Sequence, residues 1–191
     1  MRVFRYETVD ADAGRTVKSI LKGTLGLSTG LIKRLKFHQW ICLDNAPVYV
    51  SQRVNSGQCV EVRLHDEDKV HAAHEAICAP VDVVYEDEDL LIVCKPAPLP
   101  SIVSAKQQGD TLEGRMYHYF QDVPDYVYRP VNRLDKGTSG LLSIARHAHA
   151  QHLLTKQLHT GGFIREYLAV TQGIPVQESG VIDAPIGRHH T

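Results

Sequence analysis

Residues 129–146 read RPVNRLDKGTSGLLSIAR and carry the strongest indication of the fold. Apolar residues at both ends flank a polar centre, NRLDKGTSG, which contains Gly137 and Gly140. Apolar segments separated by a polar, glycine-containing turn are typical of neighbouring strands. We therefore predict two strands around a polar turn in this stretch.

Strand and helix patterns continue on both sides of this stretch. The expected elements are two strands around an acidic turn within 81–96, a proline-rich loop at 97–109, a helix at 111–121, a helix at 147–159 ended by Gly161 and Gly162, and a strand at 163–173. Because strands and helices are mixed without a regular strand–helix–strand repeat, the pattern favours an α+β fold over a doubly wound sheet.

The N-terminal part predicts a smaller unit of two helices and a sheet. The expected helices cover 16–23 and 28–37, with a break at Gly26 and with Ser28 or Thr29 as the N-cap of the second. Alternating residues in QWICLD, APVYVS and CVEVRL predict a hairpin around Asp44-Asn45 and a further strand. We expect this unit to span 1–66, a polar linker to span 67–80 and a second domain to span 81–191.

Length and composition are those of a water-soluble globular protein. The chain has 191 residues, of which 43% are hydrophobic, and no apolar run approaches the ~18 residues that a membrane helix needs. The N-terminus has no signal-peptide pattern, so we expect a cytoplasmic protein that does not contact a membrane. We also expect a monomer. The chain has four cysteines, Cys42, Cys59, Cys78 and Cys94. They form no CxxC pair, which favours buried thiols over a zinc site.

Charge is unevenly distributed, although the net charge is only −1. Residues 14–43 contain six Lys or Arg and no acid, and residues 126–165 contain six basic residues and one acid, Asp135. Between these blocks, residues 66–89 contain nine acids and one lysine. Basic blocks of this kind are expected in a protein that neutralises phosphates, and two solvated helix faces are the alternative.

Asp135 is the candidate catalytic group. Its neighbours Arg133 and Lys136 are cations, and Thr138 and Ser139 can donate hydrogen bonds. Such neighbours keep a carboxylate ionised, as a nucleophile or a stabilising anion requires. The alternative is an Asx-type turn held by a salt bridge, because turns also favour Asp, Gly, Thr and Ser.

The stretch NRLDKGTSGLL closely resembles the catalytic loop of RNA pseudouridine synthases of the RluA/RluD type, whose pattern is (H)RLDxxTSGLL. Three further stretches resemble this family in its order and spacing: YEDEDLLIVCKPAPLP, IREYLAVTQG and IDAPIGR. The resemblance implies a mixed, mainly antiparallel catalytic domain that isomerises uridines within RNA, with no cofactor and no metal.

The resemblance also implies roles for individual residues. Asp135 matches the essential carboxylate, and Arg133 matches the arginine that fills the space of the flipped base and pairs with the aspartate. Tyr167 matches the tyrosine that stacks on the uracil, with a core tyrosine as the alternative. Arg129, Lys136 and Thr138 are expected to contact backbone phosphates or to support the loop. Asn132 departs from the family pattern, in which histidine is commoner, and it cannot titrate.

The N-terminal stretches STGLIKRLKFHQWICLDNAPV and GQCVEV resemble the alpha-L RNA-binding module of some ribosomal proteins. This implies RNA contacts through Lys33, Arg34 and Lys36, and an RNA partner that is ribosomal RNA or transfer RNA, with ribosomal RNA favoured. Family members continue beyond the segment that resembles IDAPIGR. We therefore expect this chain to be a truncated form with exposed apolar sheet surface and little turnover.

Other functions remain as alternatives. A non-catalytic RNA-binding protein would share the basic blocks. A phosphoryl-transfer enzyme would need the order DKTGT, whereas this chain has DKGTSG and no acidic magnesium motif after it. A glycosidase would need two facing carboxylates. His147, His149 and His152 do not share one helix face, so histidines facing solvent or RNA are favoured over metal ligands.

Overall fold

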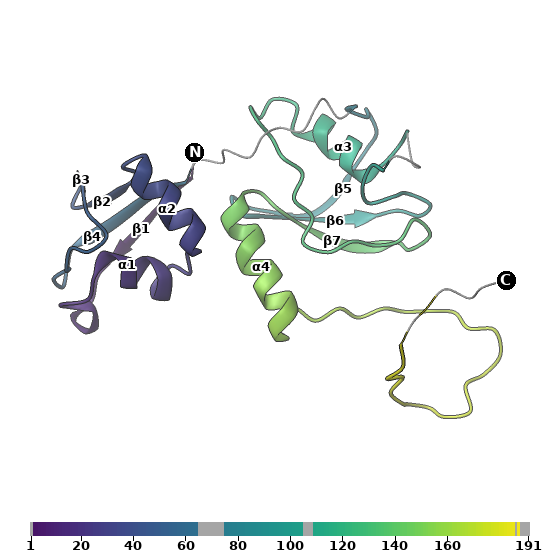
Figure 1. Cartoon of the computed structure of the whole chain (residues 1–191). Helices are drawn as coiled ribbons and strands as arrows, with labels where there is room; N and C mark the ends of the chain where they lie inside the picture. Colours follow the sequence, from purple (N-terminus) through teal and green to yellow (C-terminus); the bar gives the residue numbers. More distant parts are fainter. Residues whose placement is uncertain (1, 65–74, 105–108, 186, 188–191) are drawn as a thin grey trace.

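Two antiparallel sheets organise the computed structural model, which describes residues 2–64, 75–104, 109–185 and 187 (Figure 1). The first half contains β1 (Arg2–Glu7), η1 (Asp10–Asp12), α1 (Val17–Ser19), η2 (Ile20–Thr24), α2 (Thr29–Phe37), β2 (Ile41–Leu43), β3 (Ala46–Pro47) and β4 (Cys59–Leu64). The second half contains β5 (Asp82–Glu86), β6 (Leu90–Lys95), α3 (Leu112–Tyr119), β7 (Gly140–Ala145) and α4 (Ala148–Thr160). The predicted mixture of helices with antiparallel sheets is confirmed.

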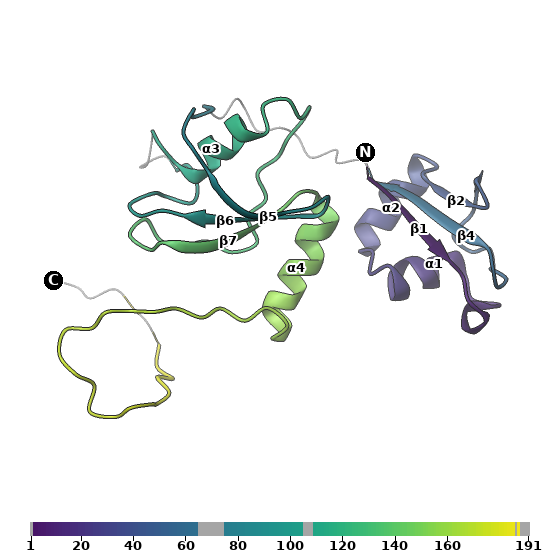
Figure 2. The same ribbon diagram turned by 180° about the vertical axis from the view of Figure 1, so that it is seen from behind.

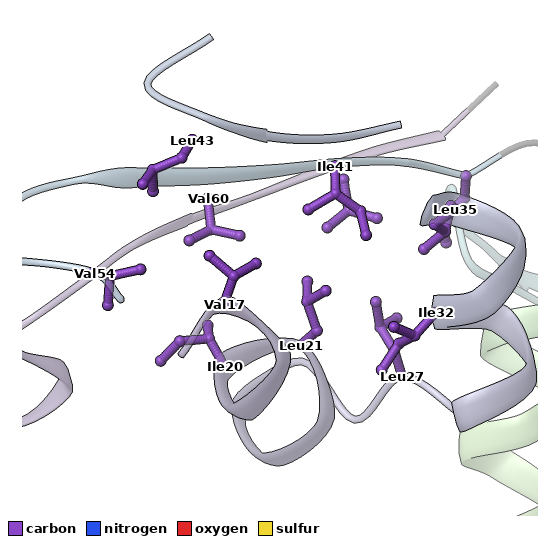
Figure 3. Packing of buried hydrophobic residues seen from close by; sticks show 12 residues of the cluster. Val17, Ile20, Leu21, Leu27, Ile32, Leu35, Ile41, Leu43, Val54 and Val60 are labelled. Carbon is purple, nitrogen blue, oxygen red and sulfur yellow. The ribbon is translucent and has the colours of Figure 1, made fainter. Parts of the chain in front are cut away.

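The N-terminal sheet has the strand order β1-β4-β2-β3, and its helices cover one face. Figure 2, from behind, shows β1 and β4 in front of α1 and α2. Side chains of α1, η2 and α2 point toward the sheet (Figure 3), where Val17 lies near Val60 and Leu35 lies toward Ile41. These apolar residues are nearly or fully buried, and their removal from water is the main stabilising contribution in this unit.

The N-cap of α2 is one of the two residues expected. Of the two candidate caps, Ser28 is the one used, because its Oγ accepts a hydrogen bond from the Leu31 N–H at 3.2 Å. The break at Gly26 is confirmed, with a φ of +65° that glycine adopts at low cost. The helix expected at 16–23 is divided into α1 and the single π-helical turn η2.

Strand β1 is an element that the sequence analysis missed. It pairs with β4 along its whole length, from Arg2 opposite Leu64 to Glu7 opposite Cys59. Phe4 and Tyr6 alternate with Arg5 and Glu7, a pattern that could have indicated a strand. Only the pairing partner, more than fifty residues away, makes this short charged segment a strand.

Two buried carboxylates in the N-terminal unit predict acid sensitivity. The Tyr6 hydroxyl, the Val9 N–H and Arg15 hold the pKa of Asp12 below its ordinary value, despite burial. Arg63 and Arg5 lower the pKa of Glu61 in the same way. A carboxylate with a lowered folded-state pKa stabilises the fold above its unfolded pKa and loses this effect as pH falls through the folded value.

We therefore expect the N-terminal unit to unfold at lower denaturant concentration as pH falls below about 4. Urea titrations at several pH values, followed by Trp40 fluorescence, measure this shift. In the double variant Asp12→Asn with Glu61→Gln, the pH dependence should be flatter. An equally steep loss in that variant would contradict the assignment.

The second sheet has the order β5-β6-β7 and is covered by α3 on one face (Figure 1). Leu91 and Val93 of β6 pack with Leu112 and Met116 of α3, and all four are at most 1% exposed. Helix α4 follows β7 directly and is the longest described helix, with 13 residues. No described helix is both long and apolar enough to cross a membrane.

Two strand predictions in this half are wrong. The arm before Asp135 forms only an isolated bridge between Pro130 and Ile144, because the Ser143 N–H bonds to the Asn132 side chain and not to the Val131 carbonyl. Residues 163–173 form no strand, and the side chains of Leu168 and Val170 are fully exposed. A strand requires a hydrogen-bonded neighbour, and none pairs with these residues within the described part of the chain.

The expected linker at 67–80 is described only from residue 75. There, the Ile77 N–H donates to the Gly114 carbonyl at 2.9 Å. A Cβ at Gly114 would lie 2.7 Å from the Ile77 side chain, so α3 needs glycine at this contact. Residues 75–80 therefore pack against α3, and the expected domain boundaries stay a prediction.

Candidate active site

Leu134 anchors the polar loop that carries Asp135 to the hydrophobic core. Ser101 Oγ donates to the Leu134 carbonyl at 2.6 Å, and Ser101 Oγ in turn accepts a hydrogen bond from the Leu134 N–H at 3.1 Å. The Leu134 side chain is buried in the hydrophobic core that includes Leu91 and Val93 of the second sheet. Because Leu134 is held inward by its backbone and its side chain, its neighbours Arg133 and Asp135 are exposed.

Further bonds fix both ends of this loop. The Thr138 N–H donates to the Asp135 carbonyl at 3.0 Å, which closes a turn, and the Leu99 N–H donates to the Lys136 carbonyl at 3.0 Å. The loop then enters β7 at Gly140, whose φ of +127° is rarely adopted by other residues. A loop tied at several points holds its exposed carboxylate in one geometry, which suits a reactive group.

Asn132 has a structural role in the loop. It is 8% exposed, and its Oδ1 accepts a hydrogen bond from the Ser143 N–H at 3.2 Å. The Val131 N–H donates to the Ser143 carbonyl at 2.8 Å, so both backbone groups of Ser143 are engaged. The departure from the family's commoner histidine therefore leaves a buried side chain that holds β7 to the loop.

Lys95 is a site residue that the sequence did not predict. It lies opposite Gly140 in the sheet, at the end of β6 beside the entry of the loop into β7. Its side chain is fully buried, and Nζ donates to the carbonyls of Leu99 at 2.6 Å and Pro96 at 3.0 Å. A lysine that ends an apolar strand just before proline was the available signal.

Lys95 is also electrostatically coupled to Asp135. Burial lowers the pKa of Lys95 below its ordinary value, and the negative charge of Asp135 opposes this shift. The exposed carboxylate thus interacts electrostatically with a buried cation, and two further cations, Arg133 and Lys136, lie within two residues of it in the sequence. Within the described residues, no ion pair joins Arg133 to Asp135.

The structure does not bring Tyr167 to this loop. Tyr167 is 59% exposed and lies in the extended segment that follows α4 (Figure 1). No hydrogen bond joins it to Asp135 or Arg133 among the described residues. Its role in stacking on a uracil stays a prediction.

The predicted RNA contacts occupy different environments. Lys33 and Lys36 are exposed and Arg34 is half-buried on α2, while Ile32 and Leu35 of that helix face the core. Thus α2 presents a cationic face outward. The other predicted contacts belong to the second half: Lys136 is exposed, Thr138 is half-buried, and Arg129 is 4% exposed with Nη1 donating to the Val127 carbonyl at 3.2 Å.

The histidines at the start of α4 have separate partners. His147 is the N-cap of α4, where its Nδ1 accepts from the Ala150 N–H at 3.1 Å. Its Nε2 lies 2.9 Å from Asp89 Oδ1. Both ring nitrogens of His147 are therefore engaged, and neither has a lone pair free for a metal.

Comparison with known proteins gives one family. The model of the family described as RNA pseudouridylate synthase matches residues 89–191. The uncharacterized RNA pseudouridine synthase YjbO of Bacillus subtilis is 32% identical over 169 residues, which cover 87% of this chain and 59% of that protein. Ribosomal large subunit pseudouridine synthase D of Haemophilus influenzae is 35% identical over 145 residues, covering 73% of this chain and 43% of that protein.

Structural comparison is weaker. The human RNA Pseudouridylate Synthase Domain Containing 1 superposes with a TM-score of 0.35 at 20% identity, covering 46% of this chain and 31% of that one. The chain spans between 43% and 59% of the length of the two curated relatives.

Proposed function

The chain belongs to the RNA pseudouridylate synthase family, and on this premise we propose that it converts uridine in RNA to pseudouridine with Asp135 as the catalytic carboxylate. The observation that carries the proposal is the geometry of its loop. Asp135 is exposed on a turn tied at Leu134, Thr138 and Lys136, and it lies among cations. A fixed, ionised and accessible carboxylate is what an attack on a nucleotide requires.

The reaction is an isomerisation that needs no co-reactant. The bond from ribose C1′ to uracil N1 breaks, a bond from C1′ to C5 forms, and the C5 hydrogen leaves as a proton to solvent while N1 gains one. A stacked base is not accessible to these steps, so the nucleotide is flipped out at a cost of roughly a few kcal/mol. We expect Arg133, which is exposed and lies two residues before Asp135, to fill the vacated space with its planar cation.

Tritium release tests the proposed activity. RNA labelled with tritium at C5 of uridine loses the label to water only when the C5 hydrogen leaves. Any tritium that the chain releases, however slowly, is expected to depend on Asp135, so the Asp135→Asn variant should release none. RNA affinity without release from either protein would instead support a non-catalytic RNA-binding function, which the exposure of Tyr167 favours.

The N-terminal unit is proposed to bind the RNA through α2. Lys33 and Lys36 are exposed and Arg34 is half-buried, because Ile32 and Leu35 hold the opposite face of α2 against the sheet. Cations held on a packed helix can contact successive phosphates and position an RNA without reading its sequence. We propose ribosomal RNA as the substrate, since the relative from Haemophilus influenzae is named a ribosomal large subunit enzyme.

Replacing Lys33, Arg34 and Lys36 together by alanine should weaken RNA binding and its dependence on salt. Each lost phosphate contact lowers the slope of log affinity against log salt by roughly 0.7 for a single strand. Loss of two or three phosphate contacts is therefore expected to lower this slope by about 1.4 to 2.1. Fluorescence anisotropy at several salt concentrations measures the slope. Lys156→Ala on the exposed face of α4 is the control, and an unchanged slope in the triple variant would contradict the role of α2.

A further inference from the structure

A pocket of about 310 Å³ lies between the N-terminal ends of α2 and α4. It is lined by Ser28, Gly30, Leu31, Arg34, Ala148, His149 and His152. No acidic residue lines it, and its volume lies in the usual range of small-molecule sites. Helices α2 and α4 belong to different halves of the chain and lie next to each other in Figure 1.

Packing holds these two helices together. A Cβ at Gly26, just before α2, would lie 3.1 Å from Leu153 of α4. Phe4 of β1 contacts His149 edge to face, with ring centroids 5.6 Å apart. The pocket is thus a built feature of the contact between the two halves.

Both helix ends favour an anion. Ser28 caps the Leu31 N–H, which leaves the first two amides of α2, those of Thr29 and Gly30, without an acceptor within the helix. With nine and thirteen residues, α2 and α4 each carry a partial positive charge at this end. Arg34 adds a full positive charge at the same pocket.

His149 supplies an independent sign of a ligand. It is 5% exposed and lines the pocket, and its Nδ1 is buried with no hydrogen-bond partner among the described residues. Burial, with contributions from His147 and His152, lowers the pKa of His149, while a hydrogen bond to the backbone of Leu25 acts in the opposite direction. The ring is therefore neutral near pH 7, with its N–H used at Leu25 and a free lone pair on Nδ1.

A buried lone pair without a donor is unfavourable, so a ligand that donates a hydrogen bond there would be stabilised. RNA offers such a donor in the ribose 2′-hydroxyl, next to a phosphate that suits Arg34 and the helix ends. We propose that this pocket binds one ribose-phosphate unit of the RNA backbone, with the phosphate at Arg34 and the N-terminus of α2 and the 2′-hydroxyl donating to His149 Nδ1. The inference rests on the proposed function, since it gives the same RNA a second contact.

A neighbouring groove offers a path for the strand. It has a volume of about 560 Å³ and shares Leu31, Ala148 and His149 with the pocket. It is lined by three arginines, Arg2, Arg129 and Arg146, and by two acids, Glu88 and Asp125. An RNA strand held in the pocket could therefore continue along the second half of the chain.

Binding measurements with two probes test the proposal. Oligouridine RNA and an oligodeoxyuridine strand of equal length differ only in the 2′-hydroxyl. The wild-type chain should prefer the RNA, and His149→Phe should lose about three- to tenfold in RNA affinity with little change for the deoxy strand. Arg34→Gln should weaken both probes alike, and His159→Phe at the other end of α4 is the matched control.

Several outcomes would overturn the proposal: equal loss of both probes in His149→Phe, no loss at all, or a pocket saturated by inorganic phosphate that oligouridine cannot displace. If His149→Phe fails to fold, the ¹⁵N resonance of wild-type His149 Nδ1 decides. It should shift with oligouridine and stay unchanged with the deoxy strand. These readouts need no turnover. If His149→Phe loses the preference for RNA and the wild-type chain releases no tritium, the pocket is supported and the proposed activity is rejected.

Discussion

Asparagine in place of Asp135 is expected to reduce tritium release from 5-tritiated uridine RNA by at least about a thousandfold. The amide has nearly the same shape as the carboxylate but has neither its charge nor its nucleophilicity. The Asp135 side chain is exposed, and the bonds that hold the loop belong to Ser101, Leu134 and the backbone. Stability should therefore change by less than about 0.5 kcal/mol.

Asp122→Asn is the matched control, because Asp122 is also an exposed aspartate on a loop of the same half. It should release tritium at the wild-type rate. Full activity in Asp135→Asn, or equal loss in both variants, would reject Asp135 as the catalytic carboxylate. Thermal denaturation of each protein separates loss of chemistry from loss of fold.

Alanine in place of Lys95 is expected to lower the free energy of unfolding by about 2 to 4 kcal/mol. The change leaves a cavity under the loop and removes the donor from the carbonyls of Leu99 and Pro96. Relief of the desolvation that lowers the pKa of Lys95 offsets part of this cost. Urea denaturation measures the change.

Lys136→Ala serves as the control for Lys95→Ala. Lys136 is exposed on the same loop and holds Leu99 through its backbone carbonyl, which alanine keeps. Its stability should stay within about 0.5 kcal/mol of wild type. A Lys95→Ala protein as stable as the control would show that this buried amine does not support the loop.

The loop around Asp135 shows how far local sequence determines a site. The in-and-out order of Arg133, Leu134 and Asp135 follows from one buried apolar residue between two charged ones. The sequence therefore predicted an exposed polar turn and its charged members. It did not predict Lys95 or Ser101, because these residues are more than thirty positions from Asp135 and meet the loop only through the β6–β7 pairing and the fold of residues 99–101.

The segment at 163–173 shows the opposite case. Its alternation of apolar and polar residues is that of a strand, yet the described structure gives it no neighbour and leaves Leu168 and Val170 exposed. The alternation of apolar and polar residues indicates which face of a strand would be buried, but it does not indicate which other strand would pair with it. The position of Tyr167 depends on that missing information.

By itself, the sequence determined the family, the mixed α and β class, the break at Gly26 and the charged loop, because motifs and turns depend on residues close together in the chain. Only the tertiary structure brought Lys95 close enough to Asp135 for their charges to interact, paired β1 with β4 and brought Arg34 and His149 to one pocket. Hydrogen-bonded pairing and burial join residues far apart in sequence, and no local pattern specifies which distant partner is chosen.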